Sequence, residues 1–464
     1  MSALTEAGFG VGYGRVMARR VVLVVALVLA AAVLALAAYG AHLARSLDTP
    51  EFKQALLARA HQSLGVEVSA GDLHVSLLRG VEVETIEIAN PRGFKGPLLT
   101  AGSFGLRYDL LPLLRGRLQV DELVVKGPVL GLAMDSKGGF NYQKLGPARA
   151  APGQSPASPS ASLGALDLVL SRVAVEDGRI AITDHRGASF LRLEGAELSS
   201  SFRVRGGVAQ GKGEAEVAKL SLMDALFVHD LRAPIELVER SVRLGPLRGR
   251  VAQGDASGAL DLDLQRFRYA LQLVVDRADV ATLLREAGAA PTLTGRLRGT
   301  ASLEGTGGTA TLTGRGQAEV RECRATKAPL LLLLAATLRL PELADPDFEE
   351  CRAEFTLGGG RARTPVLGLK GRAVRLSGQG SMGLESGALD YRMTLALAPA
   401  LVGRIPAKEI RAAFEDRGDS FRSIDFGVSG TAGAPRTDLL ARIGKAGALE
   451  VVKGKLRGLF GRKP

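Results

Sequence analysis

The sequence predicts a mainly β protein that is anchored in a membrane by one N-terminal helix and carries a long antiparallel sheet with a few short helices. Three observations lead to this fold class. Residues 21–40 form a run of twenty without a charged side chain. Apolar and polar residues alternate with a period of two along most of the chain after residue 66, which is typical of strands with one apolar face. Glycine contributes 58 of 464 residues and often separates the alternating runs, where it marks turns.

The apolar run from Val21 to Gly40 predicts a single transmembrane helix, because twenty residues at ~1.5 Å each extend ~30 Å, the thickness of a bilayer core. Arg15, Arg19 and Arg20 precede it, whereas basic and acidic residues balance after it. Since basic residues stay on the cytoplasmic side, we expect residues 1–20 in the cytoplasm and the rest of the chain outside it. A cleaved signal peptide is the alternative interpretation, but its apolar core is usually only ~7–15 residues long.

The exported part is expected to have three sections before its tail. Residues 41–145 form a helix-plus-sheet module, whose helix over residues 50–64 starts at Pro50 after the capping residue Thr49. Residues 146–162 are rich in Pro, Ala and Ser and predict an extended linker. Residues 163–435 form an elongated β domain.

The alternation in the β domain predicts a long antiparallel sheet with one apolar and one polar face. Residues 173–182 predict a hairpin, because Asp177-Gly178 suits a type I′ turn and apolar residues flank it on both sides. The apolar run 329–336 is too short to span a membrane, so we expect a buried helix that caps the sheet.

The chain carries no specific catalytic or metal-binding motif. The glycines at 378, 380 and 383 match a dinucleotide fingerprint, but strand-like alternation on both sides indicates a glycine-rich turn instead. The five histidines share no motif spacing. We therefore expect no enzyme, no cofactor and no metal site; a carboxylate pair on the polar face is the enzymatic alternative. Cys323 and Cys351 would meet an oxidising environment outside the cytoplasm, but the sequence gives no distance between them, so a disulfide stays open.

The C-terminal segment 436–464 predicts a basic amphipathic helix. The net charge of the chain is +12, and this segment holds eight basic residues against two acidic ones. Apolar residues recur there at near-helical spacing, which favours a membrane surface over a solvated tail. Nucleic acid is not expected as a partner, because the segment has one aromatic residue and lies outside the cytoplasm. The residues expected at the membrane surface are Arg442, Lys445, Val452, Lys453, Leu456, Leu459 and Phe460.

The chain resembles the AsmA family of Gram-negative envelope proteins. One part of the resemblance covers residues 20–145, and its most specific feature is LLPLLRGRLQVDELVVKGPVLGL followed by Asp135-x-x-Gly138-x-x-Asn141. The other part covers about residues 240–435 and ends in IDFGVSGTAGAPRTDLL, which resembles the AsmA-like C-terminal domain.

The resemblance implies a single-pass inner-membrane protein whose periplasmic sheet curls into a gutter with an apolar inner face. Such a gutter would conduct phospholipid from the inner toward the outer membrane, with acyl chains on the apolar face and headgroups at the wet edge. The alternative is a membrane-anchored scaffold that affects outer-membrane protein assembly, which requires periplasmic or outer-membrane protein partners. The alternating residues expected to line a lipid groove are Phe267, Tyr269, Leu271, Leu273, Leu389, Tyr391, Met393 and Leu395.

Overall fold

The computed structural model of the protein describes residues 50–76, 80–108, 118–146, 168–205, 208–307, 311–418 and 420–443. The expected cytoplasmic segment and transmembrane helix lie outside these residues, as do nearly all of the 146–162 linker and most of the basic tail. Within the described ranges, no helix combines the length and the apolar character that a membrane crossing requires.

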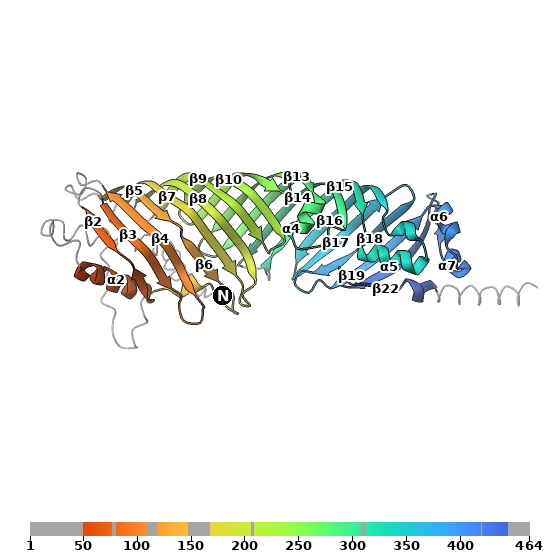
Figure 1. Ribbon diagram of the computed structural model, residues 1–464, viewed down its shortest axis with the longest axis horizontal. Coiled ribbons are helices and arrows are strands. Elements are labelled where there is room, and N and C mark those ends of the chain that lie inside the picture. Colours follow the sequence, from red (N-terminus) through yellow and green to blue (C-terminus); the bar gives the residue numbers. More distant parts are fainter. Residues whose placement is uncertain are drawn as a thin grey trace, which may run out of the picture. The chain divides into compact units, whose positions relative to one another are not determined.

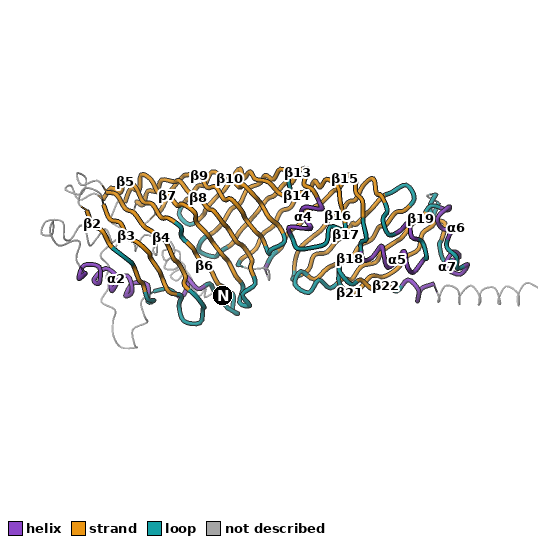
Figure 2. The backbone as a smooth tube through the Cα atoms, in the orientation of Figure 1, coloured by secondary structure: helices purple, strands orange, loops and turns teal. Residues whose placement is uncertain are grey.

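The chain divides into two compact units. Unit 1 consists of residues 1–249, 257–270 and 306–308, and unit 2 of residues 250–256, 271–305 and 309–464. Long strands dominate both units, as predicted, and loops lie mainly at the strand ends (Figures 1 and 2).

Unit 1 contains ten strands in chain order among its described residues, and the three strands that follow have residues in both units. The first ten are β1 (Val68–Ala70), β2 (Leu73–Ser76), β3 (Gly80–Ala89), β4 (Pro97–Tyr108), β5 (Leu118–Lys126), β6 (Val129–Ala133), β7 (Leu168–Thr183), β8 (Ser189–Arg205), β9 (Val208–Leu222) and β10 (Leu226–Val238). The next three are β11 (Ser241–Val251), β12 (Gly254–Asp263) and β13 (Arg268–Asp279). The helices among the described residues of unit 1 are α2 (Pro50–Leu64) and the short 3-10 helix η1 (Asn141–Lys144).

Unit 2 combines strands with several short helices. Its strands are β14 (Leu293–Thr306), β15 (Thr313–Ala325), β16 (Asp347–Gly358), β17 (Arg361–Lys370), β18 (Val374–Gly383), β19 (Leu389–Leu397), β20 (Glu415–Asp416), β21 (Arg422–Gly430) and β22 (Pro435–Thr437). Its helices are α4 (Val280–Glu286), α5 (Pro329–Leu338), η4 (Pro341–Leu343), α6 (Pro399–Arg404) and α7 (Lys408–Ala412).

The sheet of unit 1 is mixed, which corrects the expected purely antiparallel sheet. β1 and β2 pair with β3, β3 pairs with β4, and β7 to β10 follow one another, all in antiparallel fashion. Between these groups, β5 and β6 pair antiparallel with β4 but parallel with β7. A parallel pair requires a connection of about a dozen residues or more. The chain between β6 and β7 meets this requirement and contains the Pro/Ala/Ser-rich segment, so the sections on either side of it share one sheet.

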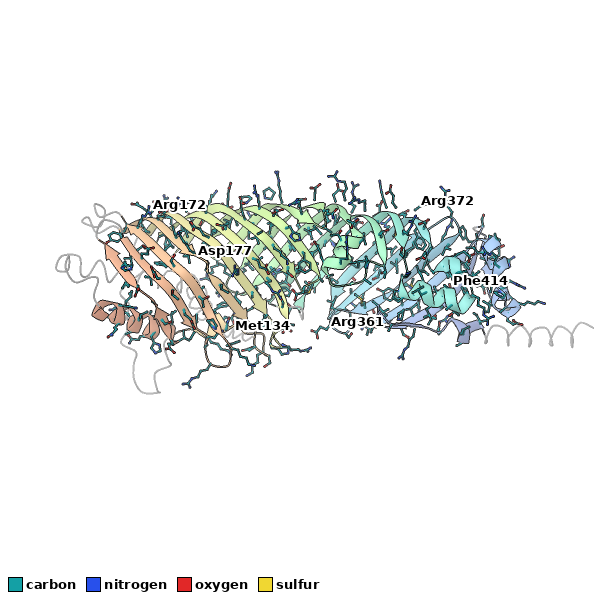
Figure 3. All side chains as sticks on the ribbon, in the orientation of Figure 1. Met134, Arg172, Asp177, Arg361, Arg372 and Phe414 are labelled. Atoms are coloured by element: carbon teal, nitrogen blue, oxygen red, sulfur yellow. A yellow bond between two sulfur atoms is a disulfide. The ribbon has the colours of Figure 1, made fainter. Side chains whose placement is uncertain are left out.

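The hairpin predicted for residues 173–182 is wrong, because β7 continues through it. Asp177 has a φ of 48°, and the register with β8 shifts on both sides of Gly178. On the other side of β7, Gly127 N donates to Glu176 O at 2.8 Å and Arg179 N donates to Pro128 O at 2.7 Å. Asp177-Gly178 is therefore a bulge opposite the break between β5 and β6, midway along the strand (Figure 3). Asp-Gly accepts a positive φ in a bulge as readily as in a turn, so the dipeptide alone does not distinguish the two.

The predicted helix over residues 50–64 is confirmed as α2, whose last residue, Leu64, is buried against the sheet of unit 1. Leu64 packs with Val66, Ile88 and Leu98, which are also buried. This contact fixes the point at which the chain enters the sheet.

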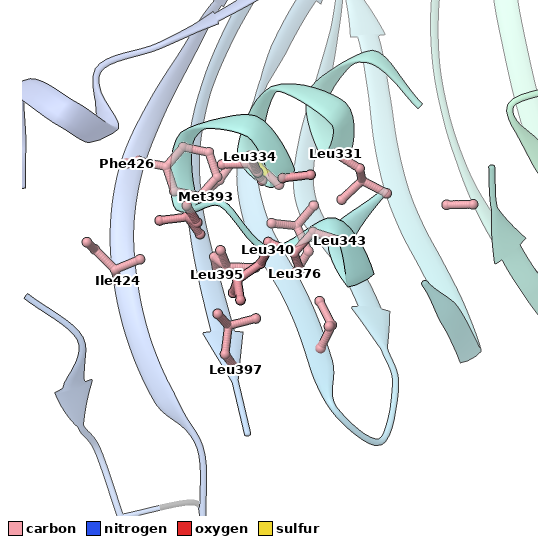
Figure 4. Close-up of a cluster of buried hydrophobic side chains, with 14 of the residues drawn as sticks. Leu331, Leu334, Leu340, Leu343, Leu376, Met393, Leu395, Leu397, Ile424 and Phe426 are labelled. Carbon is pink, nitrogen blue, oxygen red and sulfur yellow. The ribbon is translucent and has the colours of Figure 1, made fainter. Parts of the chain in front are cut away.

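Unit 2 has a closed core. Its strands pair antiparallel in the order β14 to β19, followed by β21. The expected capping helix at residues 329–336 is confirmed as α5, which lies over the apolar face of β18 and β19 (Figure 4). Leu334 and Leu338 of α5 are 0% exposed, as is Leu395 of β19 beneath them.

A disulfide joins Cys323 of β15 to Cys351 of β16 inside this core, with a Cα–Cα distance of 6.2 Å. Both residues are buried, and the chain between them carries α5 and η4. The bond therefore closes the segment that covers the sheet and settles the pairing that the sequence leaves open.

Candidate functional site

The candidate site is the apolar face of β7 to β10 in unit 1. Strand register aligns apolar side chains into rows that cross these strands. One row runs from Ile180 through Leu193 and Leu220 to Val228, and the next runs from Ile182 through Leu191 and Leu222 to Leu226.

Most of these side chains are only half-buried, in contrast to the closed core of unit 2. Leu193 and Leu220 of the first row keep part of their surface exposed, as do Leu198 and Leu231 on the same face, whereas Leu395 in unit 2 is 0% exposed. A second layer packed on the face would bury such leucines completely. An apolar surface left accessible in this way is typical of a binding site.

The opposite face of the same strands is charged. Lys212 lies 3.2 Å from Glu236, and Arg232 lies 3.4 Å from Glu216, so ion pairs link β9 and β10 on that side. These side chains are well exposed and keep the outer face in contact with water. The expected division into one apolar and one polar face is confirmed in this unit.

A segment that we call the strap, residues 134–146, crosses the opening of unit 1. It begins at Met134, whose N–H donates to Thr183 O at the end of β7 at 3.0 Å (Figure 3). Phe140 in its middle is 2% exposed and packs with Ile182 and Phe190. The ring of Phe140 also lies 4.7 Å from that of Phe267, in the turn between β12 and β13.

The strap joins two opposite edges of the sheet. By edges we mean the two sides along which the strand ends and their connecting turns lie. Successive tight turns reverse the chain from β7 onward, so the turns before β8 and β10 lie at one edge and those before β11 and β13 lie at the other. Met223 N donates to Phe190 O at the first edge, and Leu264 N donates to Arg240 O at the second, both at 2.9 Å. Phe140 contacts both edges, and the sheet of unit 1 must therefore curl until its edges approach each other.

The Asp135-x-x-Gly138-x-x-Asn141 motif builds the strap. Asp135 Oδ1 accepts hydrogen bonds from the backbone N–H groups of Lys137 and Gly139, both at 2.9 Å. Gly138 has a φ of 81°, which favours glycine. Asn141 is 0% exposed, and its Nδ2 donates to Asn90 Oδ1 at 2.8 Å and to a backbone carbonyl at 2.7 Å.

Asp135 also forms an ion pair within the strap. Lys144 Nζ lies 2.8 Å from Asp135 Oδ2. The hydrogen bond from Lys144, with those from the backbone, lowers the pKa of Asp135 to about 2. Lys144 also lies 4.6 Å from the ring centre of Phe94, which adds a cation–π contact.

The structure does not place the eight expected lining residues on one open face. Phe267 and Tyr269 are half-buried in the aromatic cluster beneath the strap in unit 1. Met393 and Leu395 are sealed beneath α5, because that helix covers the face on which they lie, and they line no open groove. The others, Leu271, Leu273, Leu389 and Tyr391, are half-buried in unit 2.

Sequence reasoning missed the aromatic partners of Phe267 and Tyr269, namely Phe140 and Phe190. The Asp-Gly-Asn spacing was a signal for a structured segment at residues 135–141, but it did not indicate which strands that segment would contact.

Of the seven residues expected at the membrane surface, only Arg442 is described, and its Nε lies 2.7 Å from Asp438 Oδ2. Leu439 and Ile443 beside it are buried in the core of unit 2, whereas Leu440 is 60% exposed. The other expected membrane-surface residues, Lys445, Val452, Lys453, Leu456, Leu459 and Phe460, lie outside the described residues.

Comparison with known sequences supports the resemblance for the N-terminal part. A family model described as the AsmA family matches residues 18–213, which extend from the expected transmembrane helix into β9. The match does not extend to residues 240–435, where the second part of the resemblance lies. Searches of the curated proteins and of the solved structures returned no match.

Proposed function

The chain belongs to the AsmA family through residues 18–213, and from this premise we propose that it binds phospholipid on the apolar face of unit 1 and conducts it through the periplasm from the inner toward the outer membrane. AsmA membership is consistent with an envelope protein engaged in lipid transport or assembly. The half-buried apolar rows of β7 to β10 are the observation that carries the more specific proposal.

The rows suit acyl chains for a physical reason. Every Å² of apolar surface removed from water contributes roughly 25 cal/mol, and a face of half-buried leucines gains this free energy only when an apolar ligand covers it. The strap narrows the opening of the curled sheet, so the polar headgroup of a lipid would remain at the wet edge while its chains lie inside.

Such a conduit needs no catalytic step, and we propose that the chain is not an enzyme. Lipid would exchange between the face and a membrane because both offer similar apolar surroundings. The direction of net movement would then depend on the source and the acceptor of the lipid.

The disulfide between Cys323 and Cys351 supports a location outside the cytoplasm, since structural disulfides persist in oxidising compartments. In this proposal residues 21–40 anchor the chain in the inner membrane as a single pass, the N-terminus is cytoplasmic, and the basic tail contacts a membrane surface. The partners are phospholipid and the inner membrane, without nucleic acid.

The second candidate is an anchored scaffold for outer-membrane protein assembly. The observation that favours it is the closed core of unit 2, which offers no open apolar face where α5 covers β18 and β19. A scaffold would bind periplasmic or outer-membrane assembly proteins instead of lipid.

The test is the amount of phospholipid that co-purifies with the full-length protein in detergent, measured by mass spectrometry. Leu198→Glu places a charge on the apolar face at a half-exposed position, and we expect it to remove most of the retained lipid without unfolding the protein. Ser199→Glu is the matched control, because Ser199 is the next residue, lies on the opposite face and is exposed. Retention equal to that of an unrelated β protein would exclude the conduit and favour the scaffold.

A further inference from the structure

The aromatic cluster beneath the strap contains a hydroxyl group with no partner in the described part of the chain. Tyr269 belongs to β13, and its ring centre lies 6.0 Å from that of Phe190. Its hydroxyl oxygen is buried and has no hydrogen bond to any described residue. Burial raises the pKa of Tyr269 to about 12, so the phenol keeps its proton and remains a hydrogen-bond donor at neutral pH.

An unpaired buried hydroxyl is unfavourable, because it has lost its hydrogen bonds to water without replacement. The great majority of buried polar groups in folded proteins have a partner, so an unpaired group calls for a physical explanation. Tyr391 in unit 2 shows the ordinary arrangement, since its hydroxyl lies 2.9 Å from Thr364 Oγ1. Packing alone does not explain the hydroxyl of Tyr269, because phenylalanine would fill the same apolar cluster.

The missing partner would reach the hydroxyl along the apolar face. Tyr269 as a whole is only half-buried, so part of its ring remains accessible although its hydroxyl is closed off from solvent. Leu191 and Leu222 pack against the same cluster and belong to one of the rows that cross β7 to β10. A ligand on this row must be apolar over most of its length and must carry an oxygen that accepts a hydrogen bond.

An acyl ester has this chemistry, because its carbonyl oxygen lies next to the apolar chain. We propose that Tyr269 donates a hydrogen bond to an ester carbonyl oxygen of a diacyl glycerolipid whose acyl chains lie on the apolar face of unit 1. The assignment rests on the proposed function and deepens it, since it names the position at which the lipid is held and the group that is recognised.

The experiment compares two probes with the full-length protein in detergent: a diacyl phosphatidylglycerol and its dialkyl ether analogue of the same chain length. The ether lacks the carbonyl but keeps the headgroup and the chains. We expect the wild-type protein to bind the diacyl lipid about threefold to tenfold more tightly, as one additional hydrogen bond allows. Tyr269→Phe should weaken binding of the diacyl lipid by the same factor and leave binding of the ether unchanged.

Tyr391→Phe is the matched control. It removes a hydroxyl that already has a partner in the protein, so it should lower the stability of the lipid-free protein and leave both affinities unchanged. Tyr269→Phe should leave the stability of the lipid-free protein unchanged or higher, because no hydrogen bond within the protein is lost.

Three results would overturn the assignment, and they differ in what else they affect. Unchanged binding of the diacyl lipid by Tyr269→Phe would exclude the ester contact but keep lipid binding. A loss of stability in lipid-free Tyr269→Phe would indicate a buried water as the partner. If the wild-type protein binds neither probe more than an unrelated β protein does, the proposed function and the assignment both fail.

Discussion

The ring of Phe140 lies 4.7 Å from the ring of Phe267, and this contact connects the strap to the turn between β12 and β13. Phe140 also packs against Phe190 at the other edge of the sheet, so its contact with Phe267 sets how far the sheet of unit 1 opens. Gly307 lies beside this contact, because its N–H donates to Phe267 O at 3.1 Å. A Cβ atom at Gly307 would lie 3.3 Å from Met134 Sδ, which leaves little room for a larger residue.

Phe140→Ala should loosen both edges of unit 1. The side chain is 2% exposed, and truncating a buried phenylalanine typically costs about 3–5 kcal/mol of stability. We expect faster amide hydrogen exchange in the strap and also in the turn at residues 264–267, which is distant in sequence. Phe355→Ala, at a half-buried position in unit 2, is the control. Faster exchange confined to the strap would show that Phe140 does not hold the second edge.

Acid should weaken the strap through Asp135. The pKa of Asp135 in the folded protein is about 2, below its ordinary value of 3.8. A lowered pKa means that the carboxylate stabilises the fold fully above pH ~4 and loses this contribution as the pH falls toward 2. The wild-type protein should therefore be more stable than Asp135→Asn in urea unfolding at pH 6, and the difference should shrink at pH 3. A difference that stays constant with pH would contradict the role of the charge.

Removing the disulfide should destabilise unit 2. The Cys323→Ala/Cys351→Ala variant should lose about 2–4 kcal/mol of stability, because the closed segment gains conformational freedom in the unfolded chain. Denaturant unfolding with and without a reductant provides the measurement. The midpoint of the wild-type protein should fall when reductant is present, whereas that of the variant should not change. An unchanged wild-type midpoint would contradict a stabilising role of the bond.

The same charged substitution should have different effects in the two units. Leu395→Asp places a carboxylate in a core where the leucine is 0% exposed, and we expect a loss on the order of 4 kcal/mol or more. Leu220→Asp should cost much less, because Leu220 is half-buried on the apolar face of unit 1. Thermal unfolding of both variants is the measurement. Equal losses would show that the face of unit 1 is a closed core.

The sequence predicts the strands, the two-faced sheet, α2 and α5 because each depends on local periodicity and on capping residues. It does not predict the parallel pairing of β5 with β7, since alternation carries no information about strand direction. Asp177-Gly178 illustrates the same limit: its conformation follows from the dipeptide, but whether the chain turns or bulges depends on Gly127 and Pro128 in a neighbouring strand.

The candidate site is less predictable from sequence for a related reason. Tyr269 and Leu395 each follow a polar residue and precede an alanine, and nothing in that pattern distinguishes a face covered by a helix from one that remains accessible. The distinction depends on where α5 and the strap lie, and both are placed by contacts between residues far apart in the chain.

The parallel ladders between β5, β6 and β7 have a consequence for the integrity of the protein. These ladders join the chain before residue 146 to the chain after residue 167 by backbone hydrogen bonds, independently of the covalent connection. If a protease cuts that connection, the two fragments still share one sheet and one apolar face. Two separately expressed polypeptides divided at this point should therefore reassemble into a nicked but complete unit 1.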